Sequence, residues 1–280
     1  MEQKSVLITG CSSGIGRCVA HGLRQCGYRV FATARRQQDV EGLLAEQFES
    51  FQLDVANSAS IRAAVDMVIE KTNGRLYGLF NNAGYGQPGA VEDLSRDMLR
   101  EQFETNLFGL HELTALLLPF MRKQGSGRII QNSSVLGLVA MKYRGAYIAS
   151  KFALEGLTDT LRMELDNTDI HVSLIEPGPI KSAFRRNAYS AFRKNIDSKS
   201  SPHAVVYEGV ERRLSSLEEV PFTLGAEAVL KRVIHALESD RPKARYYVTL
   251  PTYGLGFLKR ILPTRVMDRL LLRLSGAENQ

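Results

Sequence analysis

The chain has 280 residues, of which 44% are hydrophobic and 24% are charged. This composition is typical of a globular protein and excludes a disordered chain or a fibrous repeat. Lys and Arg outnumber Asp and Glu by 36 to 30, and a net charge of +6 could attract phosphates, nucleic acid or an anionic membrane surface. The basic residues are scattered rather than grouped, which favours a simple role in solubility.

Cysteine and histidine are few and dispersed. The cysteines, Cys11, Cys18 and Cys26, are odd in number and form no C-x-x-C pair. We therefore expect no disulfide framework and no metal site, and the pattern favours a reducing cytoplasm. The sequence contains no run of 18 uncharged apolar residues and no recognisable signal peptide, so we expect no membrane-spanning helix.

Apolar runs alternate with amphipathic segments along the chain. In chain order, the segments predicted as strands are residues 5–9, 28–33, 51–53, 76–80, 128–132, 171–175 and 245–250. The segments predicted as helices are residues 15–26, 61–69, 98–121 and 147–165. Runs rich in Val, Ile and Leu are typical of strands buried on both faces, and helix-length connections imply right-handed crossovers. The sequence therefore predicts an α/β protein with a single doubly wound parallel sheet, which binds ligands beyond the carboxyl ends of its strands.

We expect one domain over residues 1–280, because no linker divides the chain. Residues from about 182 to 223 break the alternation and are rich in Arg, Lys, Ser and Asn. This insertion is interpreted as a loop and helix that cover the substrate site, and the alternative is an inert surface excursion. Phe184, Tyr189 and Phe192 within it, and the apolar residues 135–141, could line an apolar pocket or belong to the ordinary core.

A glycine-rich turn joins the first predicted strand to the first helix, in the order Thr9-Gly10-Cys11-Ser12-Ser13-Gly14-Ile15-Gly16. Glycine permits the tight turn and the close approach of phosphate oxygens to the backbone. The start of the following helix offers free N–H groups and the positive end of its dipole. Glycine clusters also occur in ordinary turns, but this position in the first βαβ unit favours a dinucleotide site.

The end of the second strand bears on the choice of dinucleotide. An NAD site usually offers a carboxylate to the adenosine ribose there, whereas this chain has Arg35 and Arg36. Two guanidinium groups suit a 2′-phosphate monoester, so we predict a preference for NADP(H), with NAD(H) still possible. The alternative is that one or both arginines are solvated surface residues. Asp54 and Val55, after the third strand, are predicted to meet the adenine ring, and Asp54 could equally cap a helix.

Three residues form a candidate catalytic group. Ser134 follows a predicted strand, Tyr147 comes 13 residues later, and Lys151 lies four residues further on the same helix face. A phenol titrates near pH 10, and a neighbouring ammonium and a positive nicotinamide ring would lower that pKa. Such a tyrosine can exchange a proton with a carbonyl or alcohol oxygen while Ser134 hydrogen-bonds the same oxygen.

These motifs together resemble the short-chain dehydrogenase/reductase family along nearly the whole chain. The matching pieces are Thr9-Gly10-x-x-x-Gly14-x-Gly16, Asp54, Asn81-Asn82-Ala83-Gly84, Asn106, Ser134, Tyr147-x-x-x-Lys151 and Pro177-Gly178. The resemblance implies a Rossmann-like fold and hydride transfer between nicotinamide and a carbonyl carbon. It also implies a homodimer or homotetramer.

The resemblance also implies roles for individual residues. Tyr147 would be the acid/base, Ser134 the partner of the substrate oxygen, Lys151 the holder of the nicotinamide ribose, and Asn106 the support of a proton-relay water. Beyond these, residues implied to contact the cofactor are Asn82, Ala83, Gly84, Pro177, Gly178, Ile180 and Ser182. Ser182 stands where the family commonly has Thr, and Ser13 stands where some NADP-dependent members have a basic residue. Specificity for NADP(H) would therefore rest mainly on Arg35.

Within the family, the chain looks like the retinol and hydroxysteroid dehydrogenase branch, and it is also similar to bacterial NADP-dependent aldehyde reductases. The segments that carry this likeness are Ala32-Thr33-Ala34-Arg35-Arg36, Tyr147-x-Ala149-Ser150-Lys151-Phe152-Ala153-Leu154-Glu155-Gly156 and Ile175-Glu176-Pro177-Gly178-Pro179-Ile180.

Residues 251–280 form a basic amphipathic extension interrupted by Pro263. Attachment to anionic lipid is one interpretation, and the favoured one is packing against the domain or a second subunit.

We expect an NADP(H)-dependent oxidoreductase that reduces an aldehyde or ketone on an apolar small molecule, or oxidises the matching alcohol. The alternative is a regulatory protein that binds NADPH without turnover, which would not need the intact Ser, Tyr and Lys set. Nucleic acid is not an expected partner, because the sequence has no recognised module or basic stripe with stacking aromatics.

Overall fold

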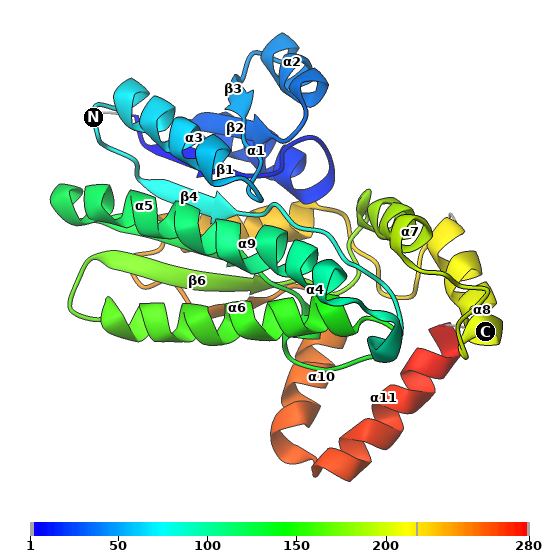
Figure 1. The fold of residues 1–280 in the computed structure, drawn as a ribbon. Coiled ribbons are helices and arrows are strands. Elements are labelled where there is room, and N and C mark those ends of the chain that lie inside the picture. The colour runs from blue at the N-terminus through cyan, green and yellow to red at the C-terminus, as the bar shows by residue number, and fades with distance from the viewer. Residues whose placement is uncertain (1–2, 217, 279–280) are drawn as a thin grey trace.

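The computed structural model describes residues 3–216 and 218–278. Its centre is a seven-stranded, wholly parallel sheet (Figure 1), with the strands in the order β3-β2-β1-β4-β5-β6-β7. The strands are β1 (Ser5–Ile8), β2 (Arg29–Ala34), β3 (Glu49–Gln52), β4 (Gly78–Asn81), β5 (Gly127–Asn132), β6 (Ile170–Glu176) and β7 (Arg245–Tyr247). The chain runs outward from β1 to β3 and then crosses to β4, which leaves a topological switch point between β1 and β4. This is where such sheets bind ligands. The predicted doubly wound parallel sheet is confirmed.

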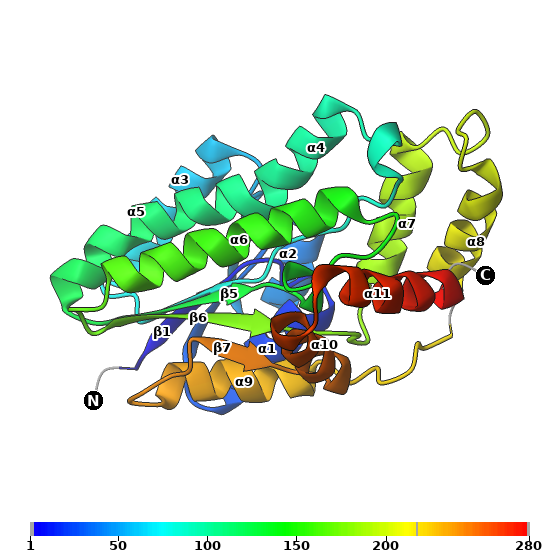
Figure 2. The ribbon, with the colours of Figure 1, turned by 90° about the horizontal axis from the view of Figure 1, so that it is seen from below.

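Helices cover both faces of the sheet (Figure 2). One face packs against α1 (Gly14–Gln25), α2 (Gln37–Ala45) and α9 (Glu227–Glu238), and the other against α3 (Ser58–Lys71), α5 (Gly109–Gln124) and α6 (Gly145–Glu164). In β1, Val6 and Ile8 point into the first of these cores and Leu7 into the second. Because successive strand residues face opposite sides, an apolar run without alternation is buried on both faces.

The long helix predicted over residues 98–121 is a composite. It consists of α4 (Arg96–Phe103), a π-helical turn over Glu104–Phe108, and α5. A π-helical turn inside an α-helix often marks a functional site, and this one contains Asn106.

The insertion folds as two helices, α7 (Phe184–Asn195) and α8 (Ala204–Ser215). They enclose a small core of their own, in which Phe192 packs against Tyr207 with ring centroids 5.2 Å apart. Phe192 is therefore a core residue of the insertion. It does not line the apolar pocket that the sequence allowed for it. Tyr189 packs against the same core.

The final strand is shorter than predicted. Residues 245–250 were expected to be extended, but β7 ends at Tyr247 and α10 (Leu250–Ile261) begins at Leu250. Pro251 stands in the first turn of α10, where its missing N–H costs no hydrogen bond, so the sequence favours a helix start here rather than a longer strand.

The C-terminal extension is a pair of helices, α10 and α11 (Thr264–Glu278), that project together from the body in Figure 1. Met267 and Leu271 of α11 are buried against Leu136, Val139 and helix α6. This part of the extension packs against the domain, in agreement with the favoured interpretation. Among the described residues, no helix is both long and apolar enough to cross a membrane.

Candidate active site

The glycine turn lies directly after β1 and is shaped for close packing. Gly10 and Gly14 have φ angles of +73° and +57°, a region that side chains disfavour. A Cβ at Gly16 would lie 2.3 Å from the carbonyl oxygen of Gly10, so only glycine lets α1 approach the turn. Within the described chain, the Ser13 side chain caps no N–H of the first turn of α1. These N–H groups and the helix dipole therefore suit a pyrophosphate.

The segment after β4 braces the glycine turn. The backbone N–H groups of Asn82 and Ala83 both donate to Thr9 Oγ1, at 2.9 and 2.8 Å. Asn82 Nδ2 donates to the carbonyl oxygens of Thr9 and Gly10, and Asn132 Nδ2 donates to Asn82 Oδ1 at 3.0 Å. The structure thus brings Asn82 and Ala83 to the glycine turn.

The loop after β6 bridges the two halves of the site. The Val135 N–H, beside Ser134, donates to the carbonyl oxygen of Pro177 at 2.8 Å. At the other end of the loop, a Cβ on Gly14 would lie 2.9 Å from Ser182 Cβ. Gly178 between them allows no side chain, since its Cβ would meet Thr249 Oγ1 at 2.1 Å. This loop therefore lies where a bound dinucleotide would be covered. Ile180 packs in part against the core beside α1 and α9.

Arg35 and Arg36 are exposed at the end of β2, and Arg36 is the N-cap residue of α2. Asp54 Oδ1 accepts the N–H of Ala56 at 3.0 Å and holds the turn after β3. The N-cap of α3 is Asn57, so Asp54 is not the helix cap that the sequence allowed. Val55 is buried, with its carbonyl oxygen against Gly109 of α5.

Ser134, Tyr147 and Lys151 come together as buried side chains. The Tyr147 hydroxyl is hydrogen-bonded to Ser134, which lies at the start of a 3₁₀ turn after β5. Lys151, one turn along α6, has its Nζ 5.8 Å from the centroid of the Tyr147 ring and donates to the carbonyl oxygen of Asn132 at 2.7 Å. The sequence prediction that these residues form one group is matched by this geometry.

Burial moves the pKa values of the tyrosine and the lysine in opposite directions. The pKa of Tyr147 is raised to about 12, because burial penalises the phenolate more than the Ser134 hydrogen bond and the charge of Arg144 favour it. The pKa of Lys151 is lowered to about 8 by burial, and Glu155 partly opposes the change. The expected lowering of the tyrosine pKa is thus not what this protein shows by itself. Tyr147 is a protonated phenol at neutral pH, which suits a proton donor.

Asn106 connects the loop after β4 to the catalytic helix. Its Oδ1 accepts the Tyr85 N–H at 3.1 Å, and its Nδ2 donates to the Tyr85 carbonyl oxygen at 2.9 Å and to Ser150 Oγ at 3.1 Å. A Cβ on Gly84 would lie 3.2 Å from Asn106 Oδ1 and 3.9 Å from Lys151 Nζ. Asn106 and Gly84 therefore border the catalytic group, as the family resemblance implies.

An aromatic side chain from the insertion covers the tyrosine. The Phe184 ring meets the Tyr147 ring edge-on, with centroids 5.3 Å apart. A Cβ on Gly86 would lie 3.0 Å from Phe184 Cζ, so the absence of a side chain at Gly86 leaves room for this contact. Of the three aromatic residues considered as pocket lining, Phe184 alone contacts Tyr147 among the described residues.

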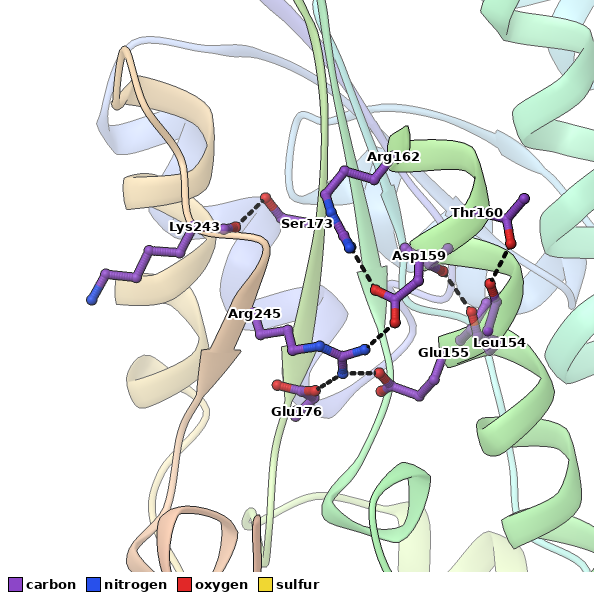
Figure 3. A network of polar contacts seen from close by, with 11 residues as sticks. Leu154, Glu155, Asp159, Thr160, Arg162, Ser173, Glu176, Lys243 and Arg245 are labelled. Atoms are coloured by element: carbon purple, nitrogen blue, oxygen red, sulfur yellow. Dashed lines mark hydrogen bonds and ion pairs between the residues drawn. The ribbon is translucent and has the colours of Figure 1, made fainter. Parts of the chain in front are cut away.

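Behind the site lies a charged cluster that sequence analysis did not find (Figure 3). Arg245 of β7 donates to Glu155 of α6, to Glu176 at the end of β6 at 2.6 Å, and to Asp159 at 2.5 Å. Burial and the charge of Glu155 raise the pKa of Glu176 to about 8. Two signals were available in the sequence: Glu155 lies one turn after Lys151, and Glu176 ends an otherwise apolar strand. Arg245 gave none, because its partners are distant in sequence.

Comparison with known proteins agrees with this geometry. The family model described as short chain dehydrogenase matches residues 4–192. The chain is 46% identical to the uncharacterized oxidoreductase YbbO of Escherichia coli K12, over 96% of this chain and 94% of that protein. It is 34% identical to human 17-beta-hydroxysteroid dehydrogenase type 1, over 89% of this chain and 78% of that protein.

A solved structure shares the fold as well. The crystal structure of a short-chain dehydrogenase from Streptomyces avermitilis has a TM-score of 0.77 and 28% sequence identity, and the match covers 99% of this chain and 97% of that one. The matched region contains the glycine turn and the Ser134, Tyr147 and Lys151 group. The chain therefore belongs to the short-chain dehydrogenase family and is an oxidoreductase acting on alcohol or carbonyl groups with NAD or NADP.

Proposed function

We propose that the protein is an NADP(H)-dependent carbonyl reductase that reduces an aldehyde or ketone on an apolar small molecule, or oxidises the matching alcohol. The observation that carries this proposal is the buried hydroxyl of Tyr147, hydrogen-bonded to Ser134 and one helical turn from Lys151. A protonated phenol in this place is suited to donate to a carbonyl oxygen.

In reduction, Tyr147 gives its proton to the substrate oxygen as that oxygen gains negative charge. Ser134 hydrogen-bonds the same oxygen and stabilises the developing charge. Lys151 lies close enough to stabilise the phenolate that remains on Tyr147. A bound dinucleotide would supply the hydride that the carbonyl carbon receives. The residues that would hold the dinucleotide are those of the glycine turn, Asn82 to Gly84 and the loop from Pro177 to Ser182.

The preference for NADP(H) is supported by Arg35 and Arg36. Both side chains are exposed at the end of β2, and no acidic residue stands between Thr33 and Gln38. A monoester phosphate there would gain charge-assisted hydrogen bonds.

We expect Arg35→Ala to raise the KM for NADPH by about 10- to 100-fold, the value of a hydrogen bond to a charged group, and to leave the KM for NADH nearly unchanged. Steady-state kinetics with both cofactors measure this, with Arg241→Ala, an exposed arginine in the loop before β7, as the control. An equal loss for both cofactors would contradict the preference.

An apolar substrate is supported by the surroundings of Tyr147. Phe184 contacts its ring, and Leu136 and Val139 lie in the same apolar cluster. Two human relatives are named for apolar substrates, 17-beta-hydroxysteroid dehydrogenase type 1 and retinol dehydrogenase 16, which are 34% and 31% identical to this chain. A panel of aldehydes, ketones, retinoids and steroids, assayed by NADPH oxidation, identifies the class.

We also propose a cytoplasmic homodimer or homotetramer. Support for self-association comes from exposed apolar side chains on the outer face beside α5 and α6, among them Phe108, Phe152 and Met163. Sedimentation velocity measures the assembly.

The test of the chemistry is Tyr147→Phe, which removes the hydroxyl and keeps the ring. We expect kcat to fall by about 10²- to 10⁴-fold, the usual contribution of a general acid. NADPH binding, measured by fluorescence titration, should be retained, because the phosphate-binding turn is intact. A Tyr147→Phe enzyme with full turnover would overturn the proposal.

A further inference from the structure

The helix α10 has one side anchored to the catalytic region. Leu255, Leu258 and Leu262 pack against the cluster that contains Tyr147 and Ile148. The position of α10 is thereby determined by the fold, and its other side is presented outward.

That other side carries a row of large apolar residues in solvent, the α10 stripe, formed by Leu250, Tyr253, Phe257 and Ile261. Their exposed fractions are 71, 49, 63 and 56%. The spacing of three, four and four residues places them on one face of the helix. Single exposed apolar residues are ordinary, but a contiguous row of four is typical of an interaction surface.

The stripe is accompanied by positive charge. Residues 250–280 contain five basic residues and two acidic ones, Asp268 and Glu278, and therefore carry +3 of the net +6 of the chain. The basic side chains are all exposed, and they are Lys259, Arg260, Arg265, Arg269 and Arg273.

A cavity of about 220 Å³ adjoins the stripe and shares Tyr253 with it. Its lining includes the cationic side chains of Arg232, Lys243 and Arg260, and no acidic residue is among the described residues that line it. Within the described chain, Nε of Arg232 is buried and has no hydrogen-bond partner. The cavity is thus suited to an anionic group held next to an apolar surface.

We propose that the α10 stripe and the basic cavity beside it dock the protein on an anionic phospholipid membrane. The stripe enters the boundary between head groups and acyl chains, and the basic side chains meet lipid phosphates. A second copy of the chain fits less well, because a symmetric contact would place a charge of +3 against another of +3. Docking in this way sets the catalytic helix next to a store of apolar molecules, since the inner side of α10 packs beside Tyr147.

Vesicle flotation of the full-length protein tests the proposal. Vesicles of phosphatidylcholine alone are compared with vesicles that contain about 30% phosphatidylglycerol, an anionic fraction comparable to a cytoplasmic leaflet. We expect binding to the anionic vesicles only, weakening as NaCl is raised and the Debye length shortens.

Two pairs of variants locate the surface. The double variant Phe257→Ser/Ile261→Ser should lower binding by at least about tenfold, because two large apolar side chains are no longer available to leave water. Its control is Leu44→Ser/Val205→Ser, which removes exposed apolar residues of α2 and α8 and should bind like the wild type. The double variant Arg260→Gln/Arg265→Gln should weaken binding to anionic vesicles and make it depend less on salt. Its control, Arg96→Gln/Lys123→Gln, should bind with the affinity and salt dependence of the wild type. Turnover of a water-soluble substrate should be unchanged in all four variants.

Several outcomes would overturn the proposal. One is a wild-type protein that does not float with anionic vesicles. Another is a stripe variant that floats as well as the wild type, or a control pair that loses binding equally. A stripe variant that dissociates to a smaller species in sedimentation velocity would identify the stripe as a contact between copies. Binding of inorganic phosphate without binding of vesicles would reduce the cavity to a site for free anions.

Discussion

Tyr147 and Lys151 show how one physical effect sets the chemistry of a residue pair. Both side chains leave water, so each favours its neutral form, which raises the pKa of the phenol to about 12 and lowers that of the ammonium to about 8. At neutral pH the tyrosine is protonated and the lysine still carries its charge. That combination favours proton donation, which is the direction needed for carbonyl reduction.

The pH dependence of reduction should follow from these values. As the pH rises through about 8, Lys151 loses its charge while Tyr147 keeps its proton. We expect kcat/KM for reduction to be constant below that pH and to fall above it by about tenfold per unit. The measurement is kcat/KM with NADPH from pH 6 to 10.

A variant separates Lys151 from the other group that titrates in this range, Glu176, whose pKa is raised to about 8. Lys151→Arg keeps a charge that does not titrate, so its profile should stay flat above pH 8, at whatever level of activity remains. If the variant shows the same decline as the wild type, Glu176 rather than Lys151 controls the profile.

At the scale of elements, Arg245 is the point where three of them meet. It pairs with Glu155 and Asp159 on α6 and with Glu176 on β6, while it stands on β7 itself (Figure 3). Glu155 lies one turn from Lys151, and Glu176 immediately precedes Pro177. The cluster therefore holds helix α6 against the loop of residues 177–182, which we propose to cover the dinucleotide.

Arg245→Met should destabilise the protein by about 3–5 kcal/mol at pH 8, since buried carboxylates lose their cation. The pKa of Glu176 is already raised from 4.5 in the folded state, so that state binds its proton more tightly than the unfolded state does. The free energy of unfolding consequently decreases as pH rises from about 4.5 to 8, and loss of Arg245 should cost less at pH 5 than at pH 8.

Urea denaturation at both pH values measures this difference. Arg241→Met, an exposed arginine four residues earlier, is the matched control and should stay within about 0.5 kcal/mol of the wild type. A loss for Arg245→Met that is equal at the two pH values would mean that the carboxylates are not the cause.

At the scale of the whole molecule, the C-terminal helices belong to the active-site half of the protein. Met267 and Leu271 of α11 are in one apolar cluster with Leu136, Val139 and Tyr147. Helix α11 thus stabilises the segment that follows Ser134.

Two neighbouring leucines test this contribution. Leu271 is 7% exposed and Leu272 is 47% exposed. We expect Leu271→Ala to lower the free energy of unfolding by about 2–5 kcal/mol, the cost of a core cavity, and Leu272→Ala to change it by less than about 0.5 kcal/mol. Thermal and urea denaturation measure both variants. Equal losses would show that α11 does not pack on the domain in solution.

The sequence was sufficient for features that depend on local order along the chain. Apolar runs spaced by helix-length segments predict the parallel sheet, because burial on both faces forbids alternation. Glycines between a strand and a helix predict the phosphate turn, and the spacing of Tyr147 and Lys151 places them on one helix face. Among the described helices, α2 and α9 were not predicted, and the insertion holds two helices where one was expected. Helix α2 is short and polar apart from Val40, Leu43 and Leu44, and α9 follows an insertion that obscures its start.

Contacts between distant segments were decided only by the tertiary structure. Arg245 meets Glu155 across 90 residues, and Phe184 rather than Phe192 reaches Tyr147 because α7 rotates Phe192 into the core of the insertion. The direction of the pKa shifts also required the structure, since spacing shows that a lysine is near a tyrosine but not how far both are removed from water. Local pattern determines which residues form each element, and the packing of elements determines the surroundings in which each side chain acts.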